Sequence, residues 1–254
     1  SIVGTRKNST YGKIITEKII EELSNYEINI ISGLAKGIDT IAHKSAIKND
    51  LKTIAVLGSG LKNIYPKENL NLAREIFKKG LLVSEFPYNE LPKKMNFPKR
   101  NRIISALSLG TLVVEAPIKS GALITADFAL DQGREVFTIP GDIDQVNAQG
   151  PLKLLKDSAA YPISSGEDII NILKNIIKPK KNSLEINSYP KLKLSSIQIK
   201  ILKSISLARG THLNIIEKKT KIPVVTLLTE LSLLEIKKII KKDQGKYFKK
   251  IKSC

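Results

Sequence analysis

Short apolar runs alternate with amphipathic segments from the start of this 254-residue chain to about residue 177. The segments between the runs, such as 11–26 and 68–80, place apolar residues three and four positions apart, as helices do. Strands that are apolar on both faces and alternate with helices predict an α/β fold: a Rossmann-like, doubly wound, mostly parallel sheet with helices on both sides. The runs have the length and the Val and Ile content of strands and lie at 1–4, 28–33, 53–58, 81–86, 111–116 and 135–141.

A change of composition near residue 178 predicts a second domain. Residues 178–193 contain two prolines and several lysines without periodicity, which is typical of a linker. Residues 194–254 then show three helical segments and a short hairpin around "DQGK", the outline of a small winged helix-turn-helix domain. We therefore expect a Rossmann-like domain over 1–177, a linker over 178–193 and a winged helix over 194–254.

The net charge of +18 is unevenly distributed. Residues 1–173 hold 22 Lys and Arg against 19 Asp and Glu, a net of +3, whereas residues 174–254 hold 20 against 5, a net of +15. So basic a balance indicates an anionic partner such as nucleic acid or a membrane surface. Only six of the basic residues are arginines, and three of these, Arg6, Arg100 and Arg102, fall in predicted loops of the first domain.

Several features favour a cytoplasmic protein. No stretch approaches the ~20 apolar residues of a membrane span, and the opening "SIVGTRKNST" lacks the regions of a signal peptide. The single cysteine, Cys254, allows no internal disulfide and no cysteine metal cluster. Because the chain opens without methionine and runs directly into a strand, we expect that an upstream domain is missing.

Two glycine-rich turns are predicted at the ligand-binding edge of the sheet, where parallel strands end. In "SGLAKGIDTIAH", Gly33 and Gly37 lie between a strand and a helix, so that amide groups and the positive end of the helix dipole point to one place. "KSGALIT" repeats this arrangement with Ser120 and Gly121. Together the two turns predict a site for a phosphate, either of a nucleotide or of a nucleic-acid backbone.

The first strand ends in "GTRK", which places Arg6 and Lys7 at the same edge. Arginine offers a planar fork suited to phosphate, although it also pairs with structural carboxylates. The turn is not the G-x-G-x-x-G fingerprint of dinucleotide sites, and no acidic residue follows about 20 positions later to hold a ribose. A nicotinamide cofactor is therefore disfavoured, and we expect no cofactor.

The longest irregular stretch of the first domain is predicted at 86–107, and long loops in compact domains are often functional. Basic residues here are unfavourable for a helix N-terminus, so stability alone does not explain them. The stretch is expected to bring to a helix N-terminus Lys99, Arg100, Asn101 and Arg102. Aromatic residues that either stack on unpaired bases or seal the end of the sheet are Tyr65, Phe86, Tyr88 and Phe97.

Candidates for catalysis are few. Asp39 and His43 lie four positions apart, which suits an acid–base pair or two metal ligands, but a structural hydrogen bond is the commoner use of such a pair. Glu85 and Glu115 each end a strand, and nothing in the sequence says that they meet. No P-loop, G-x-S-x-G or H-E-x-x-H motif is present, so we expect no catalytic residues, no metal and no enzymatic activity.

Nine motifs over residues 2–160, in order and in register, closely resemble the DNA-processing protein A (DprA or Smf) family: "IVGTR", "SGLAKGIDTIAH", "TIAVLGSGL", "YPKEN", "SEFP", "NFPKRNRIISALS", "VVEA", "SGALITADFALDQGREVFTIPG" and "QG". Many members also carry a terminal winged helix. The resemblance implies a Rossmann-like homodimer that binds single-stranded DNA, protects it and helps to load the RecA recombinase during natural transformation.

The resemblance also implies roles for individual residues. Lys36 stands where the family often has arginine, which keeps the charge and loses the fork. The family motifs place against DNA Arg6, Lys67, Lys99, Arg100 and Arg102, and around the pocket Gly33, Lys36, Gly37, Ser120 and Gly121.

Two alternatives remain open. The sheet also resembles that of nucleotide phosphoribohydrolases, whose acidic residue after the glycine-rich turn is matched only by Asp127. A transcription factor that reads duplex DNA through the winged helix is the second. The domain that binds, and the form of DNA bound, distinguish these functions.

Overall fold

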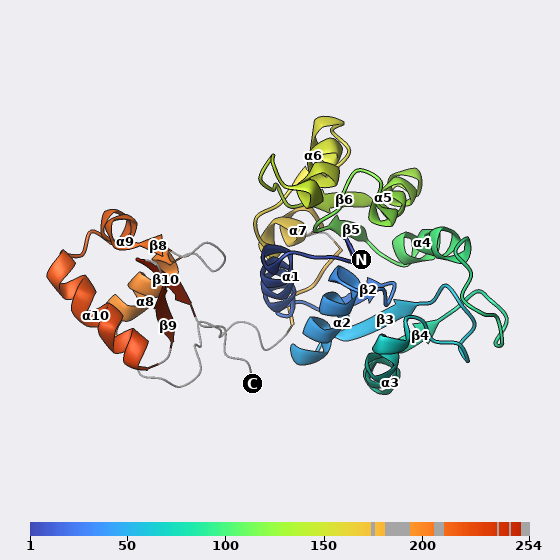
Figure 1. The fold of residues 1–254 in the computed structure, drawn as a ribbon, viewed down its shortest axis with the longest axis horizontal. Coiled ribbons are helices and arrows are strands. Elements are labelled where there is room, and N and C mark those ends of the chain that lie inside the picture. Colours follow the sequence, from blue (N-terminus) through green and yellow to red (C-terminus); the bar gives the residue numbers. More distant parts are fainter. Residues whose placement is uncertain (174–175, 181–193, 206–210, 238, 244, 250–254) are drawn as a thin grey trace. The chain divides into compact units, whose positions relative to one another are not determined.

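The computed structural model describes residues 1–173, 176–180, 194–205, 211–237, 239–243 and 245–249. The chain divides into two compact units, Ser1–Leu184 and Glu185–Cys254, which are described separately. Figure 1 shows both units with their helices and strands labelled. Most of the predicted linker, residues 181–193, lies outside the described residues, as do Arg209 and Cys254.

The first unit is built on parallel strands, and the six that the sequence predicts are all present. Two ladders run in the orders β2-β3-β4 and β1-β5-β6-β7, and the Ser32 hydroxyl of β2 donates to the Ile2 carbonyl of β1 at 2.7 Å. β7 was not predicted, since a run of two residues carries no periodicity. The strands are β1 (Ile2–Val3), β2 (Asn29–Ser32), β3 (Lys52–Val56), β4 (Leu81–Val83), β5 (Gly110–Val113), β6 (Glu135–Thr138) and β7 (Tyr161–Pro162).

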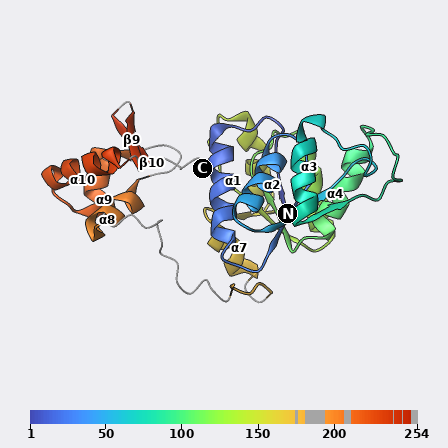
Figure 2. The ribbon, with the colours of Figure 1, turned by 90° about the horizontal axis from the view of Figure 1, so that it is seen from below.

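Helices cover both faces of these strands, which confirms the Rossmann-like class. One buried cluster packs α1, α2 and α7 on the sheet, α3 packs beside α2 on the same side, and another cluster packs α4, α5 and α6 on the opposite face. Figure 2 shows α1, α2 and α3 side by side. The helices are α1 (Thr10–Leu23), α2 (Ile38–Lys48), α3 (Leu70–Lys79), α4 (Asn96–Ala106), α5 (Gly121–Asp131), α6 (Gln149–Lys156) and α7 (Gly166–Leu173), with 3-10 turns at Lys67–Asn69 and Val146–Ala148.

Local sequence explains where several helices begin and end. The Ser9 hydroxyl accepts from the Gly12 amide at 3.0 Å and so caps the N-terminus of α1. Inside α1, Ile19 and Ile20 are fully buried in the core. Gly80 ends α3, as glycine often does.

The prediction of irregular structure over 86–107 is wrong for the second half of that segment, because α4 spans Asn96–Ala106. Pro98 lies in the first turn of this helix, where its missing N–H removes no helical hydrogen bond. Irregular structure is confined to the segment before Asn96. The basic run of residues 99–102 therefore begins in the first turn of α4 and continues into its second.

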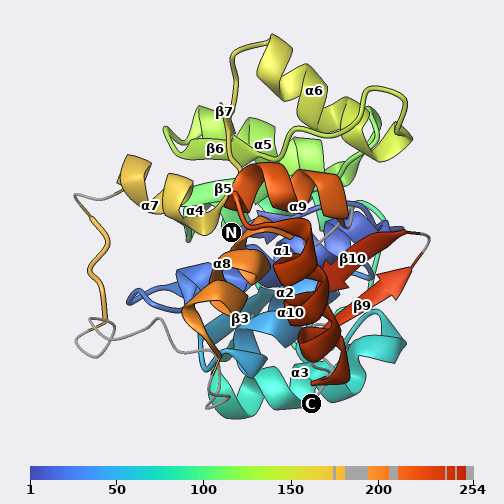
Figure 3. The same ribbon diagram turned by 90° about the vertical axis from the view of Figure 1, so that its left-hand side faces the viewer.

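Over its described residues, the second unit has three helices and three antiparallel strands in the order β8-β10-β9, and Figure 3 shows the helices and the strands β9 and β10 from another side. The three predicted helices and the hairpin are present, and Gln244 within the hairpin turn lies outside the described residues. Whether this unit is a winged helix stays a prediction. The elements are α8 (Ser196–Ser204), β8 (Thr211–His212), α9 (Leu213–Thr220), α10 (Val224–Ile236), β9 (Ile240–Asp243) and β10 (Lys246–Lys249).

Among the described residues, none of the helices is long and apolar enough to span a membrane.

Candidate nucleic-acid interface

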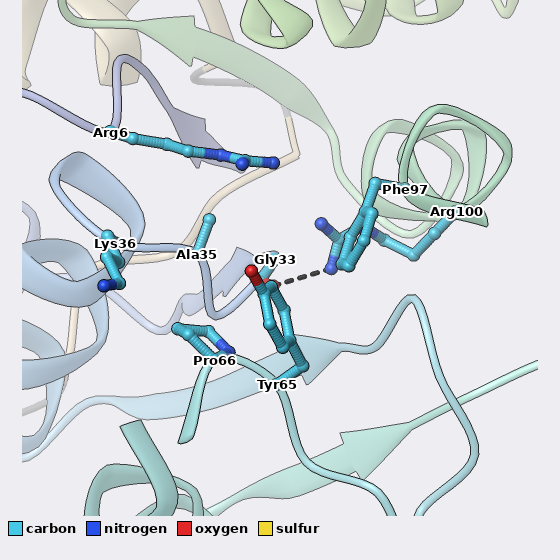
Figure 4. A pocket seen from close by; sticks show the side chains of 8 residues that line it. All are labelled: Arg6, Gly33, Ala35, Lys36, Tyr65, Pro66, Phe97 and Arg100. Atoms are coloured by element: carbon cyan, nitrogen blue, oxygen red, sulfur yellow. Dashed lines mark hydrogen bonds between the residues drawn. The ribbon is translucent and has the colours of Figure 1, made fainter. Parts of the chain in front are cut away.

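A pocket opens where the strands of the first unit end, and we call it the edge pocket. Arg6 follows β1, Gly33 follows β2, and Tyr65 lies in the segment between β3 and α3. Helix α4 supplies the remaining wall. The residues that line the pocket, shown in Figure 4, are Arg6, Gly33, Ala35, Lys36, Tyr65, Pro66, Phe97 and Arg100. Of the segments that the sequence predicts at the ligand edge, "GTRK" and the turn of Gly33 and Lys36 therefore meet there.

Arg100 forms the floor of the edge pocket. Its side chain donates to the Gly33 carbonyl at 2.6 Å and to the Val56 carbonyl, and only 4% of the residue is exposed. A Cβ atom at Gly33 would lie 2.6 Å from the Arg100 Cζ, so the close approach requires glycine. The sequence predicts that Arg100 contacts DNA, which stays a prediction; in the structure its guanidinium joins the ends of β2 and β3.

The cradle of amides after β2 is already occupied by a carboxylate of the protein. Asp39 Oδ2, in the first turn of α2, accepts from the Gly33 amide at 3.1 Å and from the Ala35 amide at 3.3 Å. This turn was expected to bind an external anion. Because Asp39 takes these two donors, an anionic ligand meets the side chains of the turn and not these amides.

Three titratable groups lie buried beneath the pocket. Burial raises the pKa of Asp39, and Arg100 and the backbone amides of Ala35 and Gly33 oppose that rise. Burial lowers the pKa of Arg100 to about 10, which still leaves the guanidinium charged at neutral pH. Burial, reinforced by Arg100, lowers the pKa of His43 to about 3 and keeps its imidazole neutral.

His43 has a structural role. Its Nδ1 lies 2.7 Å from the Thr53 hydroxyl, which itself donates to the Ile30 carbonyl at 2.8 Å. Since a hydroxyl has one proton, the imidazole donates from Nδ1 to the Thr53 oxygen. Asp39 and His43 thus each make structural hydrogen bonds, but to other groups and not to one another.

The rim of the edge pocket is exposed and cationic. The Arg6 Cζ lies 5.9 Å from the centroid of the Phe97 ring, and Lys36 forms an exposed ion pair with Glu68. The rings of Tyr65 and Phe97 are 5.5 Å apart and tilted by 49°. Figure 4 shows the Arg6 side chain extending toward Phe97, with the ring of Tyr65 beside Phe97. The rim therefore combines cations with aromatic faces.

The other predicted basic residues lie outside the set that lines the pocket. Lys7, Lys67 and Lys99 are exposed. Arg102 is paired with Glu85. Asn101 is buried, and its side-chain amide donates to the Gly121 carbonyl at 3.0 Å, which links α4 to the start of α5.

The two glycine-rich turns do not line one pocket. Ser120 and Gly121 line a separate hollow with Asp127 and residues of α6. The Ser120 hydroxyl accepts from the Ala122 amide at 3.3 Å and so caps α5. Gly37 supports the edge pocket indirectly, because its φ of +77° and a 2.2 Å approach of any Cβ to the Thr5 carbonyl oxygen both require glycine.

The two strand-end glutamates do not form a catalytic pair. Glu115 is buried and accepts from the Ser9 amide at 2.9 Å and from the Ser9 hydroxyl, at the N-terminus of α1. Glu85 pairs with Arg102. Within the described part of the chain, no group of three His, Cys, Asp or Glu side chains could hold a metal ion.

The sequence does not reveal the roles of two acidic residues that lie next to the pocket lining, Asp39 and Glu68. Asp39 is in the first turn of α2, where a carboxylate is stabilised by free amides, and this position was a usable signal. Glu68 pairs with Lys36 across 32 residues, and no local pattern indicates that contact.

Comparisons with known proteins identify the family of the chain. The family model "DNA recombination-mediator protein A" matches residues 1–174. Protein Smf of Escherichia coli K12 is 37% identical over 256 residues, covering the whole chain and 68% of that protein. DNA processing protein DprA of Bacillus subtilis is 47% identical over 172 residues, which cover 68% of this chain and 58% of that protein. The chain thus spans about three fifths to two thirds of these two relatives.

Two solved structures have the fold of the first unit. DNA processing protein A from Streptococcus pneumoniae superposes with a TM-score of 0.63 at 44% identity, covering 67% of this chain and 59% of that one. The Helicobacter pylori protein, whose structure concerns its single-stranded DNA binding mode, also gives 0.63 at 32% identity, covering 68% and 79%. By its family match and its relatives, the chain belongs to the DNA recombination-mediator protein A family.

Proposed function

We propose that this chain is a recombination mediator that binds single-stranded DNA at the edge pocket. One observation carries the proposal: Arg6 and Lys36 place exposed cations beside the aromatic rings of Tyr65 and Phe97 in a single pocket. Cations follow a phosphate backbone, and rings stack on bases of any sequence. The Helicobacter pylori relative, described by its single-stranded DNA binding mode, supports the same assignment.

The proposed biological role follows the family. We place the protein in natural transformation, where it protects incoming single strands and helps to load RecA, acting as a cytoplasmic homodimer without a catalytic activity of its own. Support for RecA, for the dimer and for the compartment comes from the resemblance and not from a contact in the molecule.

The two alternatives have less support. For a phosphoribohydrolase, Asp127 has to act with the glycine-rich turn of Ser120 and Gly121, and the three residues do line one hollow, but that hollow contains none of the residues of the edge pocket. For a duplex-reading winged helix, the third helix has to offer hydrogen-bond donors to base edges, yet Val224–Ile236 contains no Lys, Arg, Asn or Gln.

A competition experiment with the full chain tests the proposal. The anisotropy of a labelled oligothymidylate is followed while unlabelled single strand or duplex is added, and nucleoside monophosphate hydrolysis is measured on the same preparation. We expect the single strand to compete at least about tenfold better than the duplex, since stacking requires unpaired bases. Preference for duplex, or release of the base from a nucleotide, would contradict the proposal.

A further inference from the structure

Helix α10 of the second unit buries one side and exposes aliphatic residues on the other. Leu227, Leu231 and Leu234 lie in the core of this unit. On the opposite side Val225 is 78% exposed and Ile236 is 76% exposed. The outer face of α10 comprises Val225, Leu228, Thr229, Ser232, Leu233 and Ile236.

The outer face carries no charge. The two charged residues of α10, Glu230 and Glu235, accept hydrogen bonds from the Gln198 side chain at 2.7 Å and from the Lys242 amide at 3.1 Å. A surface helix usually presents charged and polar side chains to water. Contiguous exposed aliphatic residues indicate a surface that another molecule covers.

The surroundings of α10 select the kind of partner. Lys218 and Lys219 lie exposed in the last turn of α9. Lys221 precedes α10 in the chain and Lys237 follows it, and both are exposed. Residues 174–254 carry a net charge of +15, so that two copies of this region repel each other. An apolar strip within a basic unit best fits a partner whose apolar strip is bordered by carboxylates.

Two other occupants fit less well. Nucleic acid requires cations or hydrogen-bond donors on the helix that it contacts, and the outer face has only two hydroxyl groups. Helices that lie in an anionic membrane surface carry Lys or Arg on the same helix, whereas the only charged residues of α10 are glutamates.

We propose that the outer face of α10 docks an amphipathic helix of another protein, one with glutamates or aspartates beside its apolar strip. Thr229 and Ser232 lie near the middle of the face, and their small side chains allow a second helix to approach closely. The aliphatic residues around them supply the apolar contact. The proposal is independent of DNA binding at the edge pocket.

The test uses the full chain and two double variants. Val225→Ser/Ile236→Ser removes the two most exposed aliphatic side chains of the face without changing charge. Ile197→Ser/Ile215→Ser is the matched control, because these isoleucines are 38% and 46% exposed on α8 and α9. Circular dichroism and binding to oligothymidylate check that both variants fold and keep the first unit intact.

The probe is a labelled synthetic helical peptide with leucines three and four positions apart and glutamates elsewhere. A second peptide has lysines in place of the glutamates. We expect the acidic peptide to bind the wild type and the control, to lose about tenfold or more in affinity for Val225→Ser/Ile236→Ser, and to bind better than the lysine peptide. Equal binding of the acidic peptide to all three chains would overturn the proposal, because net charge alone then explains it.

Two further results would also overturn the proposal. Sedimentation that shows a dimer, lost in Val225→Ser/Ile236→Ser but not in the control, would assign the face to a second copy of the chain. Binding to vesicles of anionic lipid that depends on the same two side chains would assign it to a membrane.

Discussion

The rim and the floor of the edge pocket use the same kind of side chain in different ways. Arg6 and Arg100 lie at nearly equal distances from the Phe97 ring centroid, 5.9 Å and 6.0 Å. Arg100 is buried and bound to two backbone carbonyls, whereas the guanidinium of Arg6 has no hydrogen bond or ion pair among the described residues. Arg100, which holds the fold, and Arg6, which is available to a ligand, therefore differ in burial and not in their distance from the Phe97 ring.

The largest effect is expected at the floor. Arg100→Met leaves Asp39 as a buried carboxylate without its nearby cation and leaves two backbone carbonyls without this donor. Because a hydrogen bond to a charged group contributes about 1.5–3 kcal/mol and two such bonds are lost, we expect the free energy of unfolding to fall by about 3–6 kcal/mol in urea denaturation. Arg6→Met is the matched control at the rim, with a change of less than about 0.5 kcal/mol. Equal stability of the two variants would remove the distinction between rim and floor.

His43 makes the stability of the floor depend on pH. Its pKa is about 3 in the folded protein, against about 6.5 in an unfolded chain. As pH falls below 6.5, the unfolded state binds a proton that the folded state does not, so stability is lost by up to about 1.4 kcal/mol per pH unit until pH approaches 3.

This pH dependence is measured by urea denaturation between pH 7 and pH 4.5. His43→Gln is expected to remove this part of the slope, while His212→Gln, an exposed histidine in the second unit, leaves it unchanged. Asp39 is present in all three chains, so its own titration cancels in the comparison. An unchanged slope in His43→Gln would contradict this account, because it would show that the pKa of His43 is nearly the same in the folded and the unfolded chain.

Stacking at the rim is expected to be the next largest effect. Tyr65→Ala removes an exposed ring of the edge pocket, and loss of one stacked base lowers the free energy of binding to oligothymidylate by about 1–3 kcal/mol. Tyr88→Ala is the control, because Tyr88 is 64% exposed and does not line the pocket. If both variants bind the oligonucleotide equally well, the rings of the pocket do not hold bases.

The smallest effect concerns Glu68, which competes with phosphate for Lys36. The hydrogen bond from Lys36 lowers the pKa of Glu68, so the carboxylate is charged at neutral pH. Glu68→Gln frees the lysine, and we expect affinity for single-stranded DNA to rise about twofold to threefold, with Glu75→Gln on α3 as the control. A decrease in affinity would mean that Glu68 positions Lys36 for its ligand.

The sequence predicts the layers of the first unit and the edge where the pocket forms, because both depend on periodicity and on strand ends. It does not predict how deeply each side chain of the pocket is buried. Gly33 and Arg100 are 67 residues apart, and their contact depends on how α4 lies across β2 and β3. The expectation of an anion on the amides of the turn fails for a related reason, since Asp39 fills the cradle from within. The helix that carries the outer face of α10 is predicted from the sequence, but the exposure of that face becomes apparent only once the core is known.

The central claim is that the rim of the edge pocket, and not the more basic second unit, holds the DNA backbone. We would measure the salt dependence of oligothymidylate binding for the full chain, for Arg6→Ala/Lys36→Ala and for Lys218→Ala/Lys219→Ala. Each phosphate contact that is lost lowers the salt slope by about 0.7 for a single strand, so the rim variant is predicted to lose about 1.4 and the second-unit variant close to none. The reverse result, a reduced slope only for Lys218→Ala/Lys219→Ala, would contradict the account and place DNA on the second unit.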